Sequence, residues 1–273
     1  MKKMIALMLC AMMLCAMPLF AAAEAADYSA FTGATIDAIK ARGKMVMGTE
    51  ATYAPFEFLD ENMNFVGCDV WLAQKIADAL GVELEIMDMA FDGIISAVKS
   101  QQVDIGIAAF TVTEERAIEI DFSKIYQRDE QKLVVKKGNE DVYATTESLV
   151  GLQVGAQRGT IQSLLIQKAM PESILFELDK YPTLALEVMN ENIAGLVVDG
   201  AVADGLIANN ENLVAANYAF NPDDANFGKA AVINKGQEDF VALVDAVITD
   251  VMEDGSLAAA YEEAVEKAKT LGI

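Results

Sequence analysis

The sequence predicts an α/β protein with a mostly parallel sheet and helices on both faces. Short apolar segments alternate with longer amphipathic segments along the chain beyond its N-terminal stretch, and this alternation is typical of strand–helix–strand units. Hydrophobic residues make up 53 % of the 273 residues, which is enough apolar material for a substantial core. There is no internal repeat, low-complexity run or long flexible linker, so we expect one large domain or two modest lobes.

The first half of the chain contains three predicted strands, each a short apolar run that ends in polar residues. Two helices connect them. The first has an apolar face at Val70, Ala73, Ala77 and Leu80, and Gly81 is expected to stop it. The predicted strands are 44–50, 82–89 and 103–110, and the helices are 69–81 and 92–100.

The second half repeats the alternation. It opens with an apolar strand, and a second strand that runs into a polar loop follows. Two helices come next, and then a short strand of three apolar residues that ends in an aspartate. Two long amphipathic helices close the chain. The predicted strands are 131–138, 152–160 (with its loop) and 196–199, and the helices are 161–170, 183–195, 240–255 and 257–272.

The N-terminus is typical of an export signal. Lys2 and Lys3 precede an uncharged apolar run at 4–20, and Ala23–Ala25 has small residues around a cleavage point. We therefore expect a signal peptide at 1–25 and a soluble periplasmic protein. Because the apolar run is somewhat long, an uncleaved anchor is the alternative.

The three cysteines predict no internal disulfide. Cys10 and Cys15 each follow a leucine, whereas a lipid-anchor signal has small residues before its cysteine, so a lipid anchor is less favoured. Cleavage of the signal leaves Cys68 as the single thiol. It lies among apolar residues, and we expect it to be a small buried hydrophobe.

Charge and composition exclude several functions. Twenty basic and 42 acidic residues give a net charge of −22, which argues against binding to nucleic acid or to anionic membranes. The absence of histidine removes the most common general base and metal ligand. The run at 60–67 resembles a calcium loop but lacks its glycine and its closing glutamate, so it predicts a β-turn. We expect no metal, no cofactor and no catalytic residue.

Polar residues gather where the predicted strands end. These places are 48–58, 109–116, 156–162 and the single carboxylate Asp199, which follows an apolar run. Ligands of open α/β sheets bind at the carboxyl ends of strands, next to helix N-termini. The sequence therefore predicts a ligand site at these four places.

Residues 44–126 resemble the first lobe of solute-binding family 3, the periplasmic polar-amino-acid-binding proteins that serve ABC importers. The resemblance rests on GTEATYAPFEF, VGCDVWLA, FDGII, VDIGIAAFTVTEER and DFSKIY, and more weakly on VGAQRGTIQ and VVDGAVAD in the second half. Two departures are Cys68, where the family usually has phenylalanine, and Ala109, where serine or glycine is common.

The resemblance implies a periplasmic-binding-protein fold of two α/β lobes with the ligand cleft between them. We expect lobe 1 to comprise 26–126 and 228–273, and lobe 2 to comprise 131–223. Two hinge crossings at 127–130 and 224–227 would join the lobes. The ligand would hold the lobes closed because its contacts are divided between them.

The physical properties of three groups suit a free amino acid. Arg116 can hold a carboxylate through two parallel hydrogen bonds, and Thr113 is expected to cap its helix. Thr111 can present its hydroxyl. The free N–H groups of Gly159, Thr160 and Ile161 at a helix start would bind the same carboxylate. The alternative for Arg116 is an ion pair with Glu114 or Glu115.

The resemblance adds the remaining roles. It assigns the ammonium to Asp199, helped by the Ala109 carbonyl, and makes Tyr53 and Phe91 aromatic walls with Glu50 at the far end. Taken alone, Asp199 could instead cap the following helix, and Tyr53 and Phe91 could be core residues. The predicted ligand-binding residues are Glu50, Tyr53, Phe91, Ala109, Phe110, Thr111, Arg116, Gly159, Thr160, Ile161 and Asp199.

The predicted function is capture of a free polar amino acid and its delivery to the membrane permease of an ABC importer, by a monomer. Glu50 and the aromatic walls favour a cationic side chain, so arginine, lysine or ornithine ranks first, then cystine and glutamine. Acidic ligands rank last, and Arg158 beside the loop of the second half is a counter-charge that keeps them from being excluded. Two alternatives remain: a cyclohexadienyl-type dehydratase with Glu50 as acid, and a ligand sensor that acts through a membrane receptor.

Overall fold

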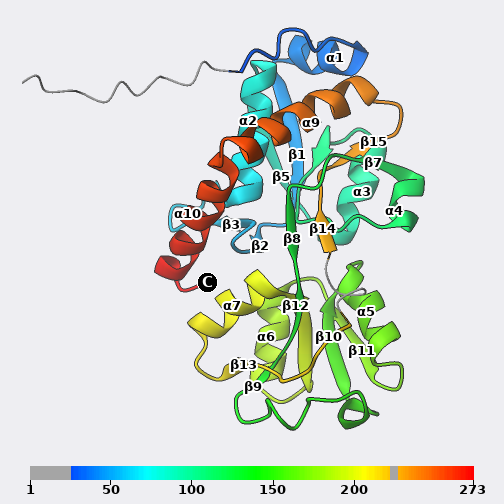
Figure 1. The fold of residues 1–273 in the computed structure, drawn as a ribbon, viewed down its shortest axis with the longest axis vertical. Helices are drawn as coiled ribbons and strands as arrows, with labels where there is room; N and C mark the ends of the chain where they lie inside the picture. Colours follow the sequence, from blue (N-terminus) through cyan, green and yellow to red (C-terminus); the bar gives the residue numbers. More distant parts are fainter. Residues whose placement is uncertain (1–25, 222–226) are drawn as a thin grey trace, which may run out of the picture.

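Two five-stranded sheets form the frame of the protein (Figure 1). The computed structural model describes residues 26–221 and 227–273. The expected signal peptide and most of the second expected crossing, 224–227, lie outside the described residues.

The first sheet has the strand order β5-β1-β6-β15-β7. Its strands are β5 (Glu83–Asp88), β1 (Lys44–Thr49), β6 (Ile105–Gly106), β15 (Val232–Asn234) and β7 (Ile120–Phe122). β1 pairs in parallel with β5 and β6, whereas β15 is antiparallel to both of its neighbours. A strand from the C-terminal part of the chain therefore completes the sheet that the N-terminal part begins.

The second sheet has the order β11-β10-β12-β9-β13. Its strands are β11 (Ile174–Leu178), β10 (Gln153–Gln157), β12 (Gly195–Asp199), β9 (Gln131–Lys136) and β13 (Leu213–Ala215). β10 pairs in parallel with β11 and β12, and β9 is antiparallel to β12 and β13. Each sheet is thus mostly parallel with one reversed strand, as the alternation of the sequence predicts.

Helices cover both faces of each sheet and bury its apolar residues. On the first sheet, α1 (Ala34–Arg42), α2 (Cys68–Leu80) and α9 (Glu238–Glu253) share one core, and α3 (Phe91–Lys99) packs on the other face. On the second sheet, α6 (Tyr181–Met189) and α7 (Gly200–Asn209) share one core and α5 (Ile161–Ala169) belongs to another. The described part of the chain also contains α4 (Glu114–Glu119), η1 (Glu147–Leu149) and α10 (Ser256–Leu271).

Two antiparallel strands run between the lobes, namely β8 (Gln127–Asp129) and β14 (Phe227–Lys229) (Figure 1). A small three-stranded sheet lies beside the first lobe and consists of β2 (Thr52–Tyr53), β3 (Glu57–Leu59) and β4 (Phe65–Val66). The predicted two-lobed α/β fold is confirmed by this architecture.

Several local predictions can be compared with the structure. Gly81 ends α2 with a φ of 70°, as predicted, and the Met63 N–H bonds to the Asp60 carbonyl in the predicted β-turn. Cys68 is a buried free thiol, also as predicted. Two lengths were wrong: the strand expected at 103–110 is only Ile105–Gly106, and the helix expected at 183–195 ends at Met189.

The end of α6 has a local cause. Glu191 adopts a φ of 61°, and a left-handed residue cannot continue a right-handed helix. The predicted buried face of α2 also needs a correction, because Val70 is only half-buried while Leu72 and Ile76 are fully buried. Within the described part of the chain, no helix is both long enough and apolar enough to cross a membrane.

Candidate ligand-binding site

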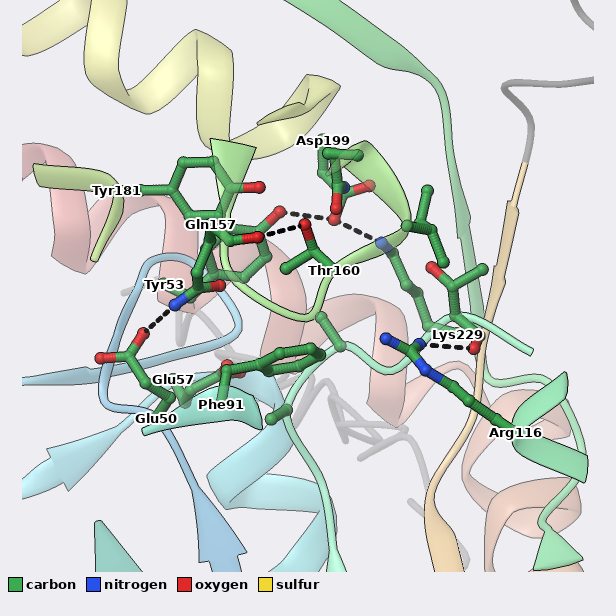
Figure 2. Close-up of a pocket in the computed structure, with 15 residues that line it drawn as sticks. Glu50, Tyr53, Glu57, Phe91, Arg116, Gln157, Thr160, Tyr181, Asp199 and Lys229 are labelled. Atoms are coloured by element: carbon green, nitrogen blue, oxygen red, sulfur yellow. Dashed lines mark hydrogen bonds and ion pairs between the residues drawn. The ribbon is translucent and has the colours of Figure 1, made fainter. Parts of the chain in front are cut away.

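A small pocket lies between the two lobes at the strand ends (Figure 2). The free volume inside it is only about 20 Å³, so the groups that line it lie close to one another. The pocket is lined by Glu50, Tyr53, Glu57, Phe91, Ala108, Ala109, Thr111, Arg116, Gln157, Thr160, Ile161, Gln162, Tyr181, Asp199 and Lys229. Both lobes therefore contribute charged and aromatic groups to one cavity.

Arg116 is held at one end of the pocket by main-chain carbonyls. Thr113 caps α4 by accepting a hydrogen bond from the Arg116 N–H at 3.2 Å, as predicted. The guanidinium donates to the Thr111 carbonyl and, across the cleft, to the Gly159 carbonyl, both at 2.9 Å. No ion pair joins it to Glu114 or Glu115 among the described residues.

Aromatic rings surround the same guanidinium. Its carbon lies 5.5 Å from the Phe91 ring centre and 5.3 Å from that of Phe110, and the two rings stack on each other at 4.5 Å. Burial lowers the pKa of Arg116 to about 10, so the group stays charged at neutral pH. A partly dry, positioned guanidinium of this kind is suited to a carboxylate.

Asp199 lies at the end of β12 and is almost completely buried. It occupies the cap position of α7, yet its carboxylate makes no capping hydrogen bond. Instead, Oδ1 accepts from the Gln131 amide at 2.5 Å and Oδ2 accepts from the Tyr53 hydroxyl at 2.6 Å. Oδ2 also pairs with the ammonium of Lys229.

Glu50 lies at the end of the pocket opposite to Arg116 (Figure 2). Its carboxylate accepts hydrogen bonds from the Thr52 hydroxyl at 2.8 and 2.9 Å and from the Gln157 amide of the other lobe at 3.1 Å. The partly exposed ammonium of Lys180 is 3.8 Å away. Burial raises the pKa of Glu50.

Glu57 lines the pocket and lies in a strongly acidic interior. Burial, and then the neighbouring Asp69 and Glu50 carboxylates, raise the pKa of Glu57 well above its ordinary value. The neutral acid is therefore favoured.

The loop before α5 differs in one respect from the prediction. Gly159 has a φ of 75°, and the Thr160 N–H, which was expected to be free, donates to the Gln157 carbonyl at 3.3 Å. The Thr160 hydroxyl bonds to the same carbonyl at 2.7 Å. This N–H is already used because residues 157–160 form a tight turn, a property that the sequence pattern GT cannot reveal.

Ala109 is held in an unusual conformation at the mouth of the first lobe. Its φ is 48°, in the left-handed region that a non-glycine residue rarely adopts. The buried carboxylate of Asp69 accepts the Ala109 N–H at 2.7 Å and the Tyr126 hydroxyl at 2.9 Å. Asp69 therefore positions the main chain that borders the pocket.

Nine of the eleven predicted site residues line the pocket. Phe110 and Gly159 lie behind it, where both contact the Arg116 guanidinium. The prediction missed six lining residues, namely Glu57, Ala108, Gln157, Gln162, Tyr181 and Lys229. Gln157 was detectable as a polar residue at a strand end, and Lys229 as a single lysine before an apolar run.

Comparison with known proteins agrees with this geometry. Residues 45–267 match the bacterial extracellular solute-binding proteins, family 3. The chain belongs to this family. The resemblance read from the sequence is thereby confirmed.

Among similar family members is the L-cystine-binding protein TcyJ of Escherichia coli, 29 % identical over 229 residues, which cover 84 % of this chain and 85 % of TcyJ. The arginine-binding extracellular protein ArtP of Bacillus subtilis is 35 % identical over 172 residues, or 62 % of this chain and 66 % of ArtP. Both are described as binding proteins for amino acids.

Solved structures of similar proteins have the same fold. The substrate-binding protein AbpA of Streptococcus pneumoniae, bound to L-arginine, is 32 % identical, has a TM-score of 0.82, and covers 85 % of this chain and 98 % of its own. The ancestral amino acid-binding protein AncCDT-1, a precursor of cyclohexadienyl dehydratase, is 29 % identical with a TM-score of 0.78 and coverages of 85 % and 100 %.

Proposed function

We propose that this protein captures a free amino acid with a cationic side chain, arginine in the first place, and delivers it to the permease of an ABC importer. One observation carries the proposal: a guanidinium and a carboxylate, Arg116 and Glu50, lie at opposite ends of one pocket that both lobes line. The first suits the ligand carboxylate and the second suits a cationic side chain. Phe91 and Tyr53 lie along the pocket as flat apolar surfaces.

The comparisons support the same ligand class. Relatives are named for the binding of cystine, arginine or histidine, and a similar solved structure is bound to arginine. Each of these amino acids has a nitrogen-containing side chain or a second ammonium. In this protein, Arg158 pairs with Asp179 at 3.2 Å and does not line the pocket. That leaves an acidic side chain without the counter-charge considered above, and it remains the least favoured ligand.

A thermal-shift screen against arginine, lysine, ornithine, cystine, glutamine and glutamate tests the proposal. A ligand at 100 times its Kd adds about 2.7 kcal/mol to the free energy of unfolding, which gives a measurable rise in Tm. We expect the largest rise with arginine, to be confirmed by calorimetry. A larger rise with glutamate would contradict the assignment of Glu50.

We assign lobe 1 to 26–126 and 228–273 and lobe 2 to 131–223, with 127–130 and 224–227 as hinge crossings. The pairing of β8 with β14 supports this division, because it joins the two chain segments that pass between the sheets. Hinge closure then divides the ligand contacts between the lobes.

We also propose export through the signal peptide at 1–25 and a monomeric periplasmic protein. The charged start, apolar run and small residues before Ala26 support export. Mass spectrometry of the protein from a periplasmic fraction should give a chain that begins at Ala26. An intact N-terminus, or a lipid on Cys10 or Cys15, would contradict this.

A dehydratase activity is the second candidate, supported by the likeness to AncCDT-1 and by the raised pKa of Glu50, which suits a general acid. A carboxylate that already accepts hydrogen bonds from Thr52 and Gln157 is better suited to binding a cation. We therefore expect no aromatic product from prephenate or arogenate. Appearance of such a product would make the protein an enzyme.

A further inference from the structure

Lys229 places an ammonium of the protein itself inside the proposed amino-acid pocket. Its side chain is completely buried and lines the cavity. Its main chain is fixed in the crossing strand β14, where its carbonyl accepts the Tyr126 N–H at 2.9 Å and it forms a bridge with Thr111. The ammonium lies 5.9 Å from the Phe56 ring centre.

The partner of this ammonium is Asp199, the residue that the amino-acid resemblance reserves for the ligand. The ion pair runs from the crossing strand to β12 of the second lobe, and both side chains are at most 2 % exposed. Burying two charges is costly unless they are paired. Asp199 Oδ2 also accepts from Tyr53, and Oδ1 accepts from Gln131. The chain's own ammonium is therefore already paired with the carboxylate that the resemblance assigns to a ligand ammonium.

Two basic and two acidic side chains that line the pocket oppose one another without a ligand. Arg116 and Lys229 face Glu50 and Asp199, and burial favours the neutral form of Glu57. The ammonium of Lys180, 3.8 Å from Glu50, lies outside this lining. Free arginine would add one net positive charge to this set. A ligand with the same guanidinium and carboxylate but no amino group would add none.

We propose that Lys229 is a built-in substitute for the ligand's α-ammonium, so that the pocket also binds carboxylic acids that carry a guanidinium group but lack the α-amino group. The proposal rests on the proposed arginine site. Such an acid leaves the Lys229–Asp199 pair intact, with its carboxylate at Arg116 and its guanidinium at Glu50. Arginine must share Asp199 with Lys229 or displace it, so its α-ammonium gains less than it would at an unpaired carboxylate.

Calorimetry with arginine and with 5-guanidinopentanoate, on the wild type and on Lys229→Met, tests the proposal. In the wild type, we expect loss of the α-amino group to weaken binding by about tenfold or less. In Lys229→Met, the acid leaves Asp199 buried and without a cationic partner. We therefore expect 5-guanidinopentanoate to bind this variant more than about 100-fold more weakly than arginine does. Lys235→Met is the matched control, because Lys235 is half-exposed and pairs with Asp121 outside the pocket.

A merely structural role for Lys229 would lower stability but would not change the ratio of the two affinities. If Lys229→Met does not fold, the double variant Lys229→Met/Asp199→Asn removes both buried charges together. We expect it to bind 5-guanidinopentanoate at least as well as arginine, since no carboxylate then remains at this position to pair with the α-ammonium of arginine.

The two ligands separate failure of this proposal from failure of the proposed function. Suppose that arginine binds, and that 5-guanidinopentanoate binds much more weakly than arginine by the same factor in the wild type and in Lys229→Met. This result would overturn the role of Lys229 but leave the proposed function standing. Binding of the acid without arginine would support Lys229 and overturn the amino-acid assignment. Binding of neither ligand would overturn both.

Discussion

Replacing Arg116 by alanine tests the carboxylate end of the pocket most directly. A ligand carboxylate facing this guanidinium would accept two charge-assisted hydrogen bonds, each of which contributes about 1.5–3 kcal/mol. Water that enters the space left by the side chain recovers part of this. We therefore expect a net loss of about 2–4 kcal/mol, which is a 30- to 1,000-fold weaker affinity for arginine.

The same substitution affects stability, and the assay must allow for that. Arg116 donates to the Thr111 and Gly159 carbonyls and lies against Phe91 and Phe110. Its loss should lower Tm, so calorimetric titration is carried out well below the unfolding transition, and circular dichroism confirms that the variant is folded.

Arg158→Ala is the matched control for this experiment. Arg158 adjoins Gly159 in the sequence, but its side chain is 53 % exposed and pairs with Asp179. An exposed pair of this kind contributes little, so the affinity for arginine should change by less than about twofold. The reasoning is refuted if folded Arg116→Ala binds arginine within about fivefold of the wild type.

Three further variants test other parts of the site. Glu50→Gln should weaken arginine binding at least about tenfold but glutamine binding much less; an unchanged affinity for arginine in calorimetry would mean that the cation lies elsewhere. Burial, and then Asp199, raise the pKa of Asp129 to about 6, so the folded state holds the proton of this carboxyl more tightly than the unfolded state does. The stability that results is lost as the pH rises from about 4 through 6. In urea unfolding, the stability of wild type relative to Asp129→Asn should therefore fall by about 1–2 kcal/mol between about pH 4.5 and 7, and a rise would contradict the shift. Asp69→Ala leaves the Ala109 N–H and the Tyr126 hydroxyl without their acceptor. We expect it to lower the free energy of unfolding by about 2–5 kcal/mol, whereas Tyr126→Phe should lower it by about 1 kcal/mol. Equal losses for the two variants in urea titrations would show that Asp69 does not hold the main chain at Ala109.

Local sequence signals were sufficient for much of the fold and for one side of the site. Apolar runs bounded by polar residues located β1, β9, β10 and β12, and the threonine at 113 predicted the start of α4. These features depend on residues a few positions apart, whose spacing determines backbone geometry directly. Because ligands bind at strand ends in such folds, nine of the lining residues followed from the same pattern together with the family resemblance.

The sequence did not reveal which of these residues are already paired with one another. Asp199 is paired with Lys229, Tyr53 and Gln131, which lie 30, 146 and 68 positions away. Those contacts exist because β14 crosses between the lobes beside β8 and because the lobes face each other over the pocket. Periodicity carries no information on such long-range pairs. The sequence therefore indicated Glu50, Arg116 and Asp199, but only the tertiary structure added Glu57 and Lys229 to the pocket and decided how these charges pair.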